Sequence, residues 1–396
     1  MTSFARLLSL LFVLLASLPG LAVAAPAGRP LTVYFFDVGQ GDAALIVSPA
    51  GKTVLIDGGP PEAREPLVRR LRELVKGPLD LVILTHPHLD HLGGLSHAVR
   101  AVGAKRFMDP GFDHPSDAYR DLLEFMGQKV GQVMTPEPNP QAPQTLLTIG
   151  LGEGVALTVL WPRVPQEAFL DNTRSDPNSN SIVTKLTYGK TAFLFTGDAE
   201  ADTEEALLEK RIDFTSTVLK VAHHGGKHSS TGAFLAAVKP KAAVISCGGG
   251  NEYGHPTLET LGRLRDVGAQ VFRTDQDGEV VATSDGATVT LRRAHGGAPT
   301  VVPGVVKSTT VALGPILPSA RRAQGGGAAT AKRATELSPA QPSRGAEPGG
   351  YVSLKGSKVF HRDDCPTLKR SKSERTVYAS RAAATRERRP AEDCHP

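Results

Sequence analysis

Three histidines and an aspartate directly after an apolar run are the feature that most constrains this chain. Leu81-Val82-Ile83-Leu84 is followed by Thr85-His86-Pro87-His88-Leu89-Asp90-His91. Four apolar residues predict a buried strand, and Pro87 with the later Gly93-Gly94 pair predicts a sharp turn. A turn lets imidazole and carboxylate side chains converge, which suits zinc, and manganese also accepts such a set. The segment therefore predicts a metal site at the end of a strand.

Two further apolar runs end in residues of the same kind. Phe193-Leu194-Phe195 leads into Thr196-Gly197-Asp198, and Val218–Val221 leads into Ala222-His223-His224-Gly225-Gly226. Alone, Asp198, His223 or His224 would more often be a turn or surface residue. Together with the first segment, however, they repeat one pattern, in which an apolar strand is followed by a potential metal ligand. A closed structural zinc site is the alternative, although such sites usually use cysteines and none is near. The candidate metal ligands are His86, His88, Asp90, His91, Asp198, His223 and His224.

Residues 31–295 alternate between strand-like and helix-like patterns. We expect helices over Pro61–Val75, Tyr119–Phe125, Asp202–Leu208, Ala233–Val238 and Leu258–Val267. This alternation, without an uninterrupted βαβ repeat, predicts a layered α/β architecture. The expected strands are Leu31–Phe36, Ala44–Val47, Thr53–Ile56, Leu81–Leu84, Leu157–Leu160, Ile182–Leu186, Ala192–Phe195, Thr217–Val221, Ala242–Ile245, Gln270–Phe272 and Val280–Ala282.

The first 24 residues have the pattern of a signal peptide. Arg6 precedes an apolar run over Leu7–Leu18, and Ala22-Val23-Ala24 offers a small-x-small cleavage site before Ala25. An uncleaved membrane anchor is the alternative. No later segment is long and apolar enough to span a bilayer. We therefore expect a secreted or periplasmic protein with no stable membrane span in its mature form.

The C-terminal region changes in composition after residue 295. Residues 296–350, which include Gly325-Gly326-Gly327, are rich in small residues and proline and predict a flexible linker. Residues 351–396 form a small module with an excess of Lys and Arg. Such an excess is compatible with nucleic-acid phosphates, and a solvated charged surface is the alternative. The net charge of the whole chain, +5, permits a polyanionic partner without requiring one.

The order His-x-His-x-Asp-His, Thr-Gly-Asp and His-His-Gly resembles the metallo-β-lactamase fold hydrolases. Within them, the chain is most similar to the extracellular hydrolase domain of the ComEC competence proteins. Four further segments fit that subgroup: Phe36–Asp42, Leu55–Gly59, Asn178–Val183 and Asn251–Pro256. The resemblance covers residues 30–295 and implies an αββα sandwich with a two-metal site at the rim of its two sheets.

The resemblance also implies roles for the ligands. His86 and His88 would hold the first metal, Asp90 and His91 the second, and Asp198 would bridge them. One of His223 and His224 would complete the second site, and the sequence does not decide between them. Many family members carry another histidine ligand, and three readings remain open. His114 takes that place, or Asn178 or Asn180 stands in, or the first metal binds weakly.

The expected function is hydrolysis by a metal-bound hydroxide, with two divalent ions, zinc or else manganese, as cofactors. Asp90 would orient the hydroxide, and His224 or His255 would protonate the leaving oxygen. Lys227, Ser229 and Ser230 would meet an anionic group of the substrate. The leading interpretation is a phosphodiesterase or nuclease with DNA or another phosphodiester as partner. The alternatives are a hydrolase of another ester, thioester or lactam, and a non-catalytic metal protein that binds DNA or cell wall. The oligomeric state is not predicted.

The terminal module resembles the small zinc-binding domain of the Ada DNA-repair protein. His361, Cys365 and Cys394 could hold a further zinc ion, although Ala391 stands where another cysteine is expected. A Cys365–Cys394 disulfide is the alternative outside the cytoplasm. The third cysteine, Cys247, follows an apolar run and predicts a buried, unreactive thiol.

Overall fold

The computed structural model describes residues 29–305 and four short C-terminal segments, 351–354, 359–362, 375–378 and 389–390. The chain divides into two units, Met1–Pro318 and Ser319–Pro396. The predicted signal peptide, residues 1–24, lies outside the described residues. In the part of the chain that the structure describes, no helix has the length and apolarity needed to cross a membrane.

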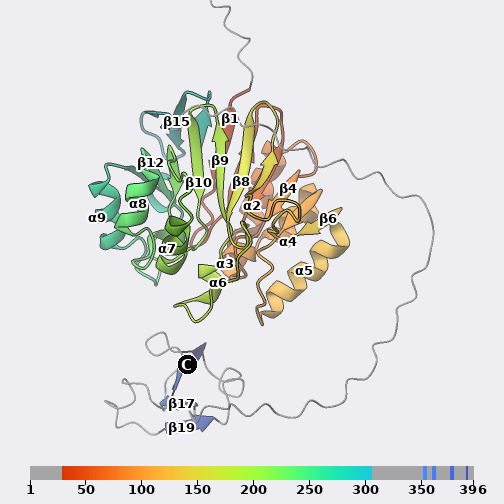
Figure 1. Ribbon diagram of the computed structural model, residues 1–396, viewed down its shortest axis with the longest axis vertical. Coiled ribbons are helices and arrows are strands. Elements are labelled where there is room, and N and C mark those ends of the chain that lie inside the picture. Colours follow the sequence, from red (N-terminus) through yellow and green to blue (C-terminus); the bar gives the residue numbers. More distant parts are fainter. Residues whose placement is uncertain (1–28, 306–350, 355–358, 363–374, 379–388, 391–396) are drawn as a thin grey trace, which may run out of the picture. The chain divides into compact units, whose positions relative to one another are not determined.

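The first large sheet has nine strands in the order β16-β15-β14-β1-β2-β3-β4-β5-β6 (Figure 1). Pairing is antiparallel from β16 to β3 and parallel from β3 to β6. Its strands are β1 (Leu31–Phe35), β2 (Ala44–Val47), β3 (Thr53–Ile56), β4 (Leu81–Ile83), β5 (Arg106–Met108), β6 (Gln132–Met134), β14 (Val280–Ser284), β15 (Thr288–Arg293) and β16 (Thr300–Pro303).

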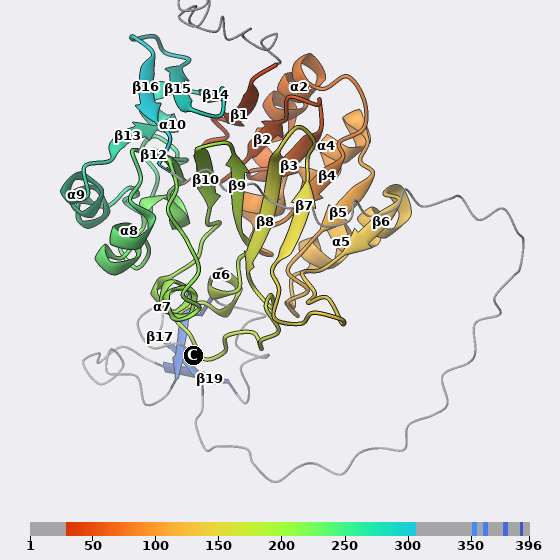
Figure 2. The same cartoon turned by 45° about the horizontal axis from the view of Figure 1, so that its top comes forward.

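The second large sheet has seven strands in the order β13-β12-β11-β10-β9-β8-β7 (Figure 2). The four strands from β10 to β13 are parallel, and β7, β8 and β9 pair antiparallel. Its strands are β7 (Leu147–Gly150), β8 (Val155–Trp161), β9 (Val183–Tyr188), β10 (Thr191–Phe195), β11 (Val218–Lys220), β12 (Ala242–Ile245) and β13 (Gln270–Arg273).

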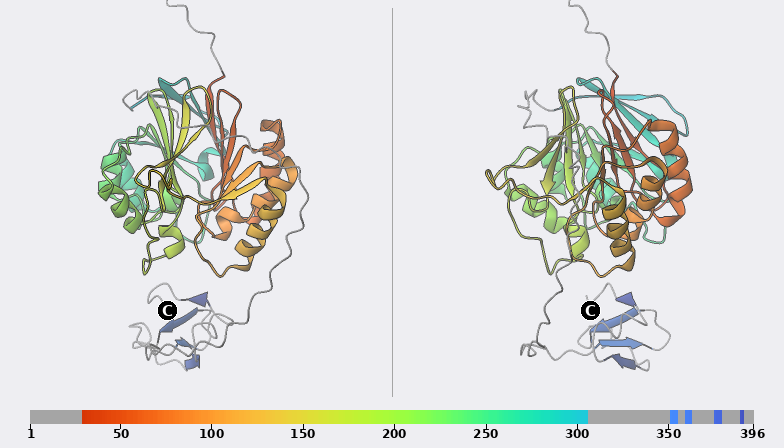
Figure 3. Two further views of the ribbon diagram at one scale, coloured as in Figure 1. Left: turned by 45° about the vertical axis from the view of Figure 1, so that its right-hand side comes forward. Right: turned by 90° about the vertical axis from the view of Figure 1, so that its right-hand side faces the viewer.

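Helices cover the outer face of each sheet (Figure 3). Helices α2 (Arg64–Leu74), α4 (Leu95–Val102) and α5 (Asp117–Lys129) pack on the nine-stranded sheet. Helices α7 (Ala201–Glu209), α8 (Gly232–Val238) and α9 (Leu258–Asp266) pack on the seven-stranded sheet. The short helices are η1 (Pro61–Ala63), α3 (Leu89–Leu92), α6 (Asp176–Ser179), η2 (Ala222–Gly225) and α10 (Thr274–Asp277). The layers run α, β, β, α, which confirms the predicted fold class.

The space between the two sheets is filled by a single apolar cluster. In β1, Leu31, Val33 and Phe35 face this cluster because side chains alternate along a strand. Phe195 of β10 meets Phe35 from the other sheet, with ring centroids 6.1 Å apart. The intervening Tyr34 points outward, toward the helices that cover the nine-stranded sheet. The two sheets are therefore joined mainly by hydrophobic contact.

The strand directions bring the ends of several strands to one rim. Strands β3 and β4 are parallel, and so are β10, β11 and β12. Carboxyl ends of parallel strands lie at the same edge of a sheet, so the loops that follow them are neighbours. These loops carry Asp57 after β3, His86 after β4, Asp198 after β10 and His223 after β11.

The nine-stranded sheet continues past the predicted end of the domain. Strand β16 lies within residues 296–350, the predicted linker, and pairs antiparallel with β15. Its Val302 is buried in the cluster between the sheets. The predicted domain, which ends at residue 295, is therefore too short at its C-terminal end. The sequence did not indicate β16, because a strand with only one buried side chain gives little periodic signal. Residues 306–350 lie outside the described residues.

The C-terminal unit contains a small sheet in the order β19-β17-β18-β20. Its strands are β17 (Tyr351–Leu354), β18 (Val359–Arg362), β19 (Arg375–Tyr378) and β20 (Arg389–Pro390). His361 belongs to β18, whereas Cys365 and Cys394 lie outside the described residues. The zinc site, the alternative disulfide and the resemblance to the Ada module all stay predictions.

Replacing Phe35 by alanine should lower the free energy of unfolding by about 3–5 kcal/mol, the usual cost of removing a buried phenylalanine. Val301→Ala is the matched control, because Val301 is 62% exposed and should change stability by less than about 0.5 kcal/mol. Denaturant unfolding followed by circular dichroism measures both. A loss at Phe35 no larger than the control would contradict the assigned core.

Candidate metal centre

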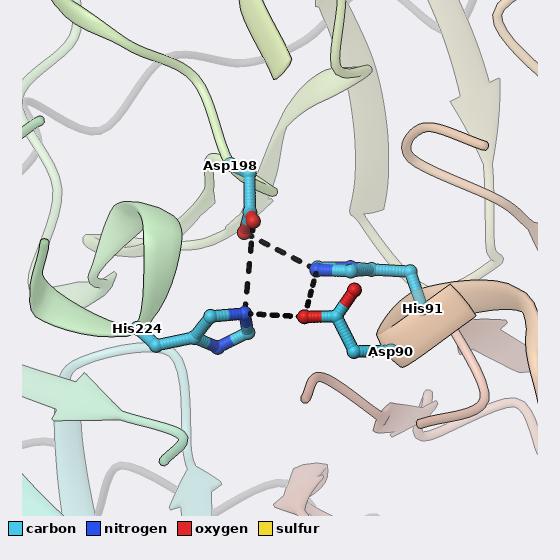
Figure 4. A group of neighbouring side chains, drawn as sticks. All are labelled: Asp90, His91, Asp198 and His224. Atoms are coloured by element: carbon cyan, nitrogen blue, oxygen red, sulfur yellow. Dashed lines mark hydrogen bonds and ion pairs between the residues drawn. The ribbon is translucent and has the colours of Figure 1, made fainter. Parts of the chain in front are cut away.

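Four side chains from both halves of the fold converge at the rim (Figure 4). Asp90 and His91 belong to α3, Asp198 follows β10, and His224 belongs to η2. One potential ligand atom of each lies within 4.8 Å of the others. His91 Nε2 is 3.3 Å from Asp198 Oδ1, and His224 Nε2 is 3.1 Å from Asp90 Oδ2. These four residues are called the metal group below.

The metal group contains buried polar atoms that no hydrogen bond satisfies. Within residues 29–305, His91 Nε2 and Asp198 Oδ1 are such atoms, although they face each other. Buried polar atoms almost always have a hydrogen-bond partner in folded proteins, so two neighbouring atoms without one need an explanation. Two imidazoles and two carboxylates around one point are ligands that zinc accepts. The residues therefore fit a divalent cation, typically zinc.

The backbone at η2 is bent so that both of its histidines project toward the rim. His223 and His224 have φ values of 50° and 52°, in the left-handed region. Side chains other than glycine seldom adopt this region, and it persists only where the surroundings impose it. His224 Nδ1 donates a hydrogen bond of 3.0 Å to the Ser246 carbonyl oxygen. This bond leaves His224 Nε2 for the metal group.

A buried aspartate orients the other imidazole. Asp57 Oδ2 accepts a hydrogen bond of 2.8 Å from His91 Nδ1. Asp57 also accepts bonds of 2.7 Å from the backbone N–H and the hydroxyl of Thr85. A carboxylate behind a histidine fixes the tautomer and the ring direction of a metal ligand. Asp57 therefore directs His91 Nε2 toward Asp198.

A second buried aspartate connects the two sheets. Asp42 Oδ2 lies 2.8 Å from Lys220 Nζ, and Asp42 Oδ1 lies 3.4 Å from His224 Nδ1. Lys220 Nζ also donates a bond of 2.9 Å to the carbonyl oxygen of Val221. Asp42 precedes β2 in one sheet and Lys220 ends β11 in the other. The pair ties the loop of the nine-stranded sheet to the histidine turn. Sequence reasoning did not single out Lys220.

Neighbouring carboxylates govern the protonation of the two histidines in the metal group. Burial by itself would lower the pKa of His224, but Asp198, Asp42 and Asp90 together raise this pKa to about 10. Burial likewise opposes a charge on His91, yet Asp198 and Asp57 raise its pKa well above the usual value. Closely placed carboxylates thus stabilise positive charge at this point. That is the electrostatic character expected of a cation site.

The structure places the remaining predicted ligands beside the metal group. His86 Nε2 lies 3.8 Å from Asp198 Oδ2 and 3.0 Å from His88 Nδ1. His223 Nε2 lies 3.9 Å from Asp198 Oδ2, while its Nδ1 lies 3.3 Å from Glu200 Oε1. Of the paired histidines, His224 therefore joins the metal group and His223 borders it. The second ion, held by His86 and His88, stays a prediction.

The candidates for the missing ligand differ in position. The His114 ring lies 6.1 Å from the His88 ring, but His114 Nδ1 accepts a hydrogen bond from the Ser116 N–H. Asn180 bonds the backbone of Leu170 through both its amide oxygen and its amide nitrogen. Asn178 has a buried Oδ1 without a hydrogen-bond partner in the described chain. Asn180 thus has a structural role, and His114 and Asn178 stay open.

A cleft of about 320 Å³ lies beside the metal group. Asp90, Asp198 and His224 contribute to its lining, together with Gln40, His88, Leu89, Asn178, His223, Tyr253 and His255. His255, a predicted catalytic residue, packs its ring 5.4 Å from that of His223. The cleft gives a substrate access to the metal group and to His255.

The loop after the paired histidines differs from its prediction. Lys227 is exposed as expected, but Ser229 and Ser230 are buried and face inward. Arg263 holds this loop from behind by donating to the carbonyl oxygens of Ser229 and Ser230, both at 2.8 Å. The prediction that these two serines meet the substrate is therefore wrong.

Glu200 contacts two residues of the cleft lining, His223 and Asn178, and neither Glu200 nor its partner Arg174 was predicted. Glu200 is buried beside His223 and accepts a hydrogen bond from Asn178 Nδ2. Arg174 Nε lies 3.6 Å from Glu200 Oε1, and its side chain is 40% exposed. Glu200 follows Asp198 by two positions, which is the only signal that could have suggested it.

Comparison with known proteins identifies relatives of the N-terminal unit. Residues 36–168 match the family model described as the metallo-beta-lactamase superfamily. The chain is 30% identical over 266 residues to ComE operon protein 3 of Bacillus subtilis. It is 30% identical over 250 residues to competence protein ComA of Neisseria gonorrhoeae, and 31% identical over 255 residues to recombination protein 2 of Haemophilus influenzae.

These matches cover 63%, 62% and 62% of this chain but only 32%, 31% and 28% of the respective relatives. The chain therefore spans about a third of the length of the curated relatives that it matches.

Asp198→Ala and His91→Ala should each reduce the zinc bound by the full-length protein, because each removes one of four converging ligand atoms. Zinc per chain is measured by mass spectrometry of the metal after equilibration with a zinc buffer. His97→Ala is the control, because His97 lies on α4 and outside the metal group. Wild-type zinc content in both ligand variants would contradict the assigned centre.

Proposed function

The chain carries a metallo-beta-lactamase domain, and on this premise we propose that it is a metal-dependent phosphodiesterase that cleaves nucleic acid. Proteins of this fold are generally hydrolases. The observation that carries the proposal is the metal group of Asp90, His91, Asp198 and His224, which opens onto a cleft. A divalent ion bound there would supply Lewis acidity and electrostatic stabilisation of developing negative charge.

The remaining roles, which are binding the metal, orienting water and contacting the leaving group, belong to different residues. His91 and Asp198 are fully or almost fully buried, so they hold position rather than contact a substrate. The Asp90 side chain is 34% exposed, which leaves it able to orient an attacking water in the cleft. His255 lines the same cleft, and we propose that it hydrogen-bonds the leaving group. Its role as a proton donor is part of the proposal. His224, with Nε2 in the metal group and Nδ1 bonded to the Ser246 carbonyl oxygen, is assigned to the metal instead.

Basic residues beside the cleft support an anionic substrate. Arg174 is exposed, and its Nε lies 3.6 Å from Glu200 Oε1, which contacts the cleft residue His223. Lys227 is exposed on the loop that directly follows the cleft residues His223 and His224. Cations at the mouth of a site attract phosphate groups and raise the rate of association. An uncharged ester or thioester would gain nothing from this arrangement.

The names of the relatives support nucleic acid as the source of the phosphodiester. One is a competence protein by name and another is a recombination protein. Recombination is a reaction of nucleic acids. Because this chain corresponds to about a third of those proteins, the transfer of a nucleic-acid role to it is part of the proposal.

We also propose that the protein acts outside the cytoplasm, because residues 1–24 have the composition of a signal peptide. The exported chain should begin at Ala25. Mass spectrometry of the N-terminal peptide from the extracytoplasmic fraction tests this. A chain that retains residues 1–24 there would contradict cleavage.

The full-length protein loaded with zinc or manganese should hydrolyse bis(p-nitrophenyl) phosphate and single-stranded DNA, and chelation should abolish both activities. Asp198→Ala should lower kcat/KM by more than about 100-fold, since even residues behind metal ligands change activity by ~10–100-fold. His97→Ala should match the wild type.

Hydrolysis of a chromogenic lactam or thioester without phosphodiesterase activity would favour the alternative hydrolases. DNA binding without turnover under zinc, manganese and magnesium would indicate a binding protein.

A further inference from the structure

An exposed aromatic side chain stands at the cleft. Tyr253 is 61% exposed and belongs to the cleft lining together with Asp90, Asp198 and His224. Single exposed apolar residues are common and need no explanation by themselves. Tyr253 differs because it lines the same 320 Å³ cleft as the metal group. Its ring is thus within reach of a ligand that also contacts the metal group.

The loop that carries Tyr253 is fixed by one asparagine. Asn251 Oδ1 accepts hydrogen bonds from the backbone N–H groups of Tyr253 and His255, at 3.2 and 3.0 Å. Asn251 Nδ2 donates to the carbonyl oxygens of Gly248 and His255, at 2.9 and 2.5 Å. Four hydrogen bonds from one side chain hold the loop in shape. A ring presented in this way loses little conformational freedom when it binds a ligand.

The same loop rests directly on the histidine turn. A Cβ atom on Gly225 would lie 2.6 Å from the Pro256 Cβ, and one on Gly226 would lie 3.1 Å from His255 Nε2. Thr257 N–H donates a bond of 3.0 Å to the Gly225 carbonyl oxygen. The two glycines thus permit a contact that any side chain would obstruct. The position of Tyr253 relative to His224 is set by this contact.

A row of rings leads from the metal group to Tyr253. The His255 ring lies 6.4 Å from the His224 ring and 5.9 Å from the Tyr253 ring. The Tyr253 and His255 rings are inclined by only 30°, so they stack. Leu89, which is 50% exposed, adds an apolar side chain to the cleft from the other half of the fold. The cleft therefore offers flat apolar surface beside the metal group.

We infer that Tyr253 is a stacking platform for a nucleobase of the substrate, next to the phosphodiester that meets the metal group. This rests on the proposed function and makes its substrate class specific: single-stranded nucleic acid with its bases unpaired. Base stacking on an aromatic ring is tolerant of sequence, because every base has a flat face. Paired bases in a duplex do not expose that face. Tyr253 is thus a specificity-determining residue.

The experiment measures binding separately from cleavage. Fluorescence anisotropy gives the Kd of the full-length protein for a short phosphorothioate oligothymidylate, which resists hydrolysis, and for an abasic strand of equal length and charge. Tyr253→Ala should weaken oligothymidylate binding by about 5- to 150-fold, the range of one stacked base. It should leave abasic-strand binding unchanged. Tyr253→Phe keeps the ring and should bind both strands like the wild type.

Three outcomes would overturn the inference. Tyr253→Ala could bind oligothymidylate as the wild type does, or lose the same factor on the abasic strand, or Tyr253→Phe could lose as much as Tyr253→Ala. Circular dichroism of each variant checks that the fold is intact. Turnover of bis(p-nitrophenyl) phosphate is measured in parallel. If the wild type hydrolyses no phosphodiester yet shows the expected binding pattern, the proposed function fails and the stacking role stands.

Discussion

Hydrophobic packing of two sheets, face to face, is the constraint on which everything else in this molecule depends. The residues that make this contact, among them Val33, Phe35 and Phe195, carry no chemistry. Their contact nevertheless decides which strand ends lie opposite each other. Because the parallel strands of both sheets end at the same rim, α3 from one half meets η2 from the other. The metal group is thus a product of strand direction and sheet packing together.

Carboxylates dominate the electrostatics of the rim and favour the charged form of the two imidazoles in the metal group. Carboxylates outnumber the ordinary partners available to them: Asp42 has Lys220, but Asp198 and Asp90 have only imidazoles. Raised pKa values of His91 and His224 express this imbalance. Buried carboxylates without a compensating cation are costly in any protein. A divalent ion bound by these residues would compensate the charge of the buried carboxylates directly.

Much of the fold could be predicted from the sequence, because its strong signals are local. An apolar run such as Leu81–Leu84, followed after Thr85 by histidines, marks both a strand and its functional end. All eleven expected strand segments correspond to strands, whereas β5, β6, β7, β15 and β16 were not predicted. Strands β5 and β6 have three residues each, too few for a period to emerge. In β15 the alternation of Val289 and Leu291 was present but short.

The site was predictable in its residue types but not in its geometry. Sequence order could not decide between His223 and His224, since the choice depends on left-handed backbone angles within η2. Nor could it show that Ser229 is buried, because Arg263 and Glu204, which anchor that loop, come from different helices. Lys220 looked like an ordinary strand residue, and its partner Asp42 is distant in sequence. Long-range pairs of this kind leave no local pattern.

The division of the metal group between the two sheets has a mechanical consequence. Asp90 and His91 follow strand β4 of one sheet, and Asp198 and His224 follow strands β10 and β11 of the other. An ion held by all four would act as a cross-link between layers that otherwise adhere through apolar contact. Ligands that bind only the folded state stabilise it by about 2.7 kcal/mol when present at 100 times their Kd. The free energy of unfolding would then depend on the concentration of free metal, so that the same chain would be more stable in a metal-rich compartment than in a metal-poor one.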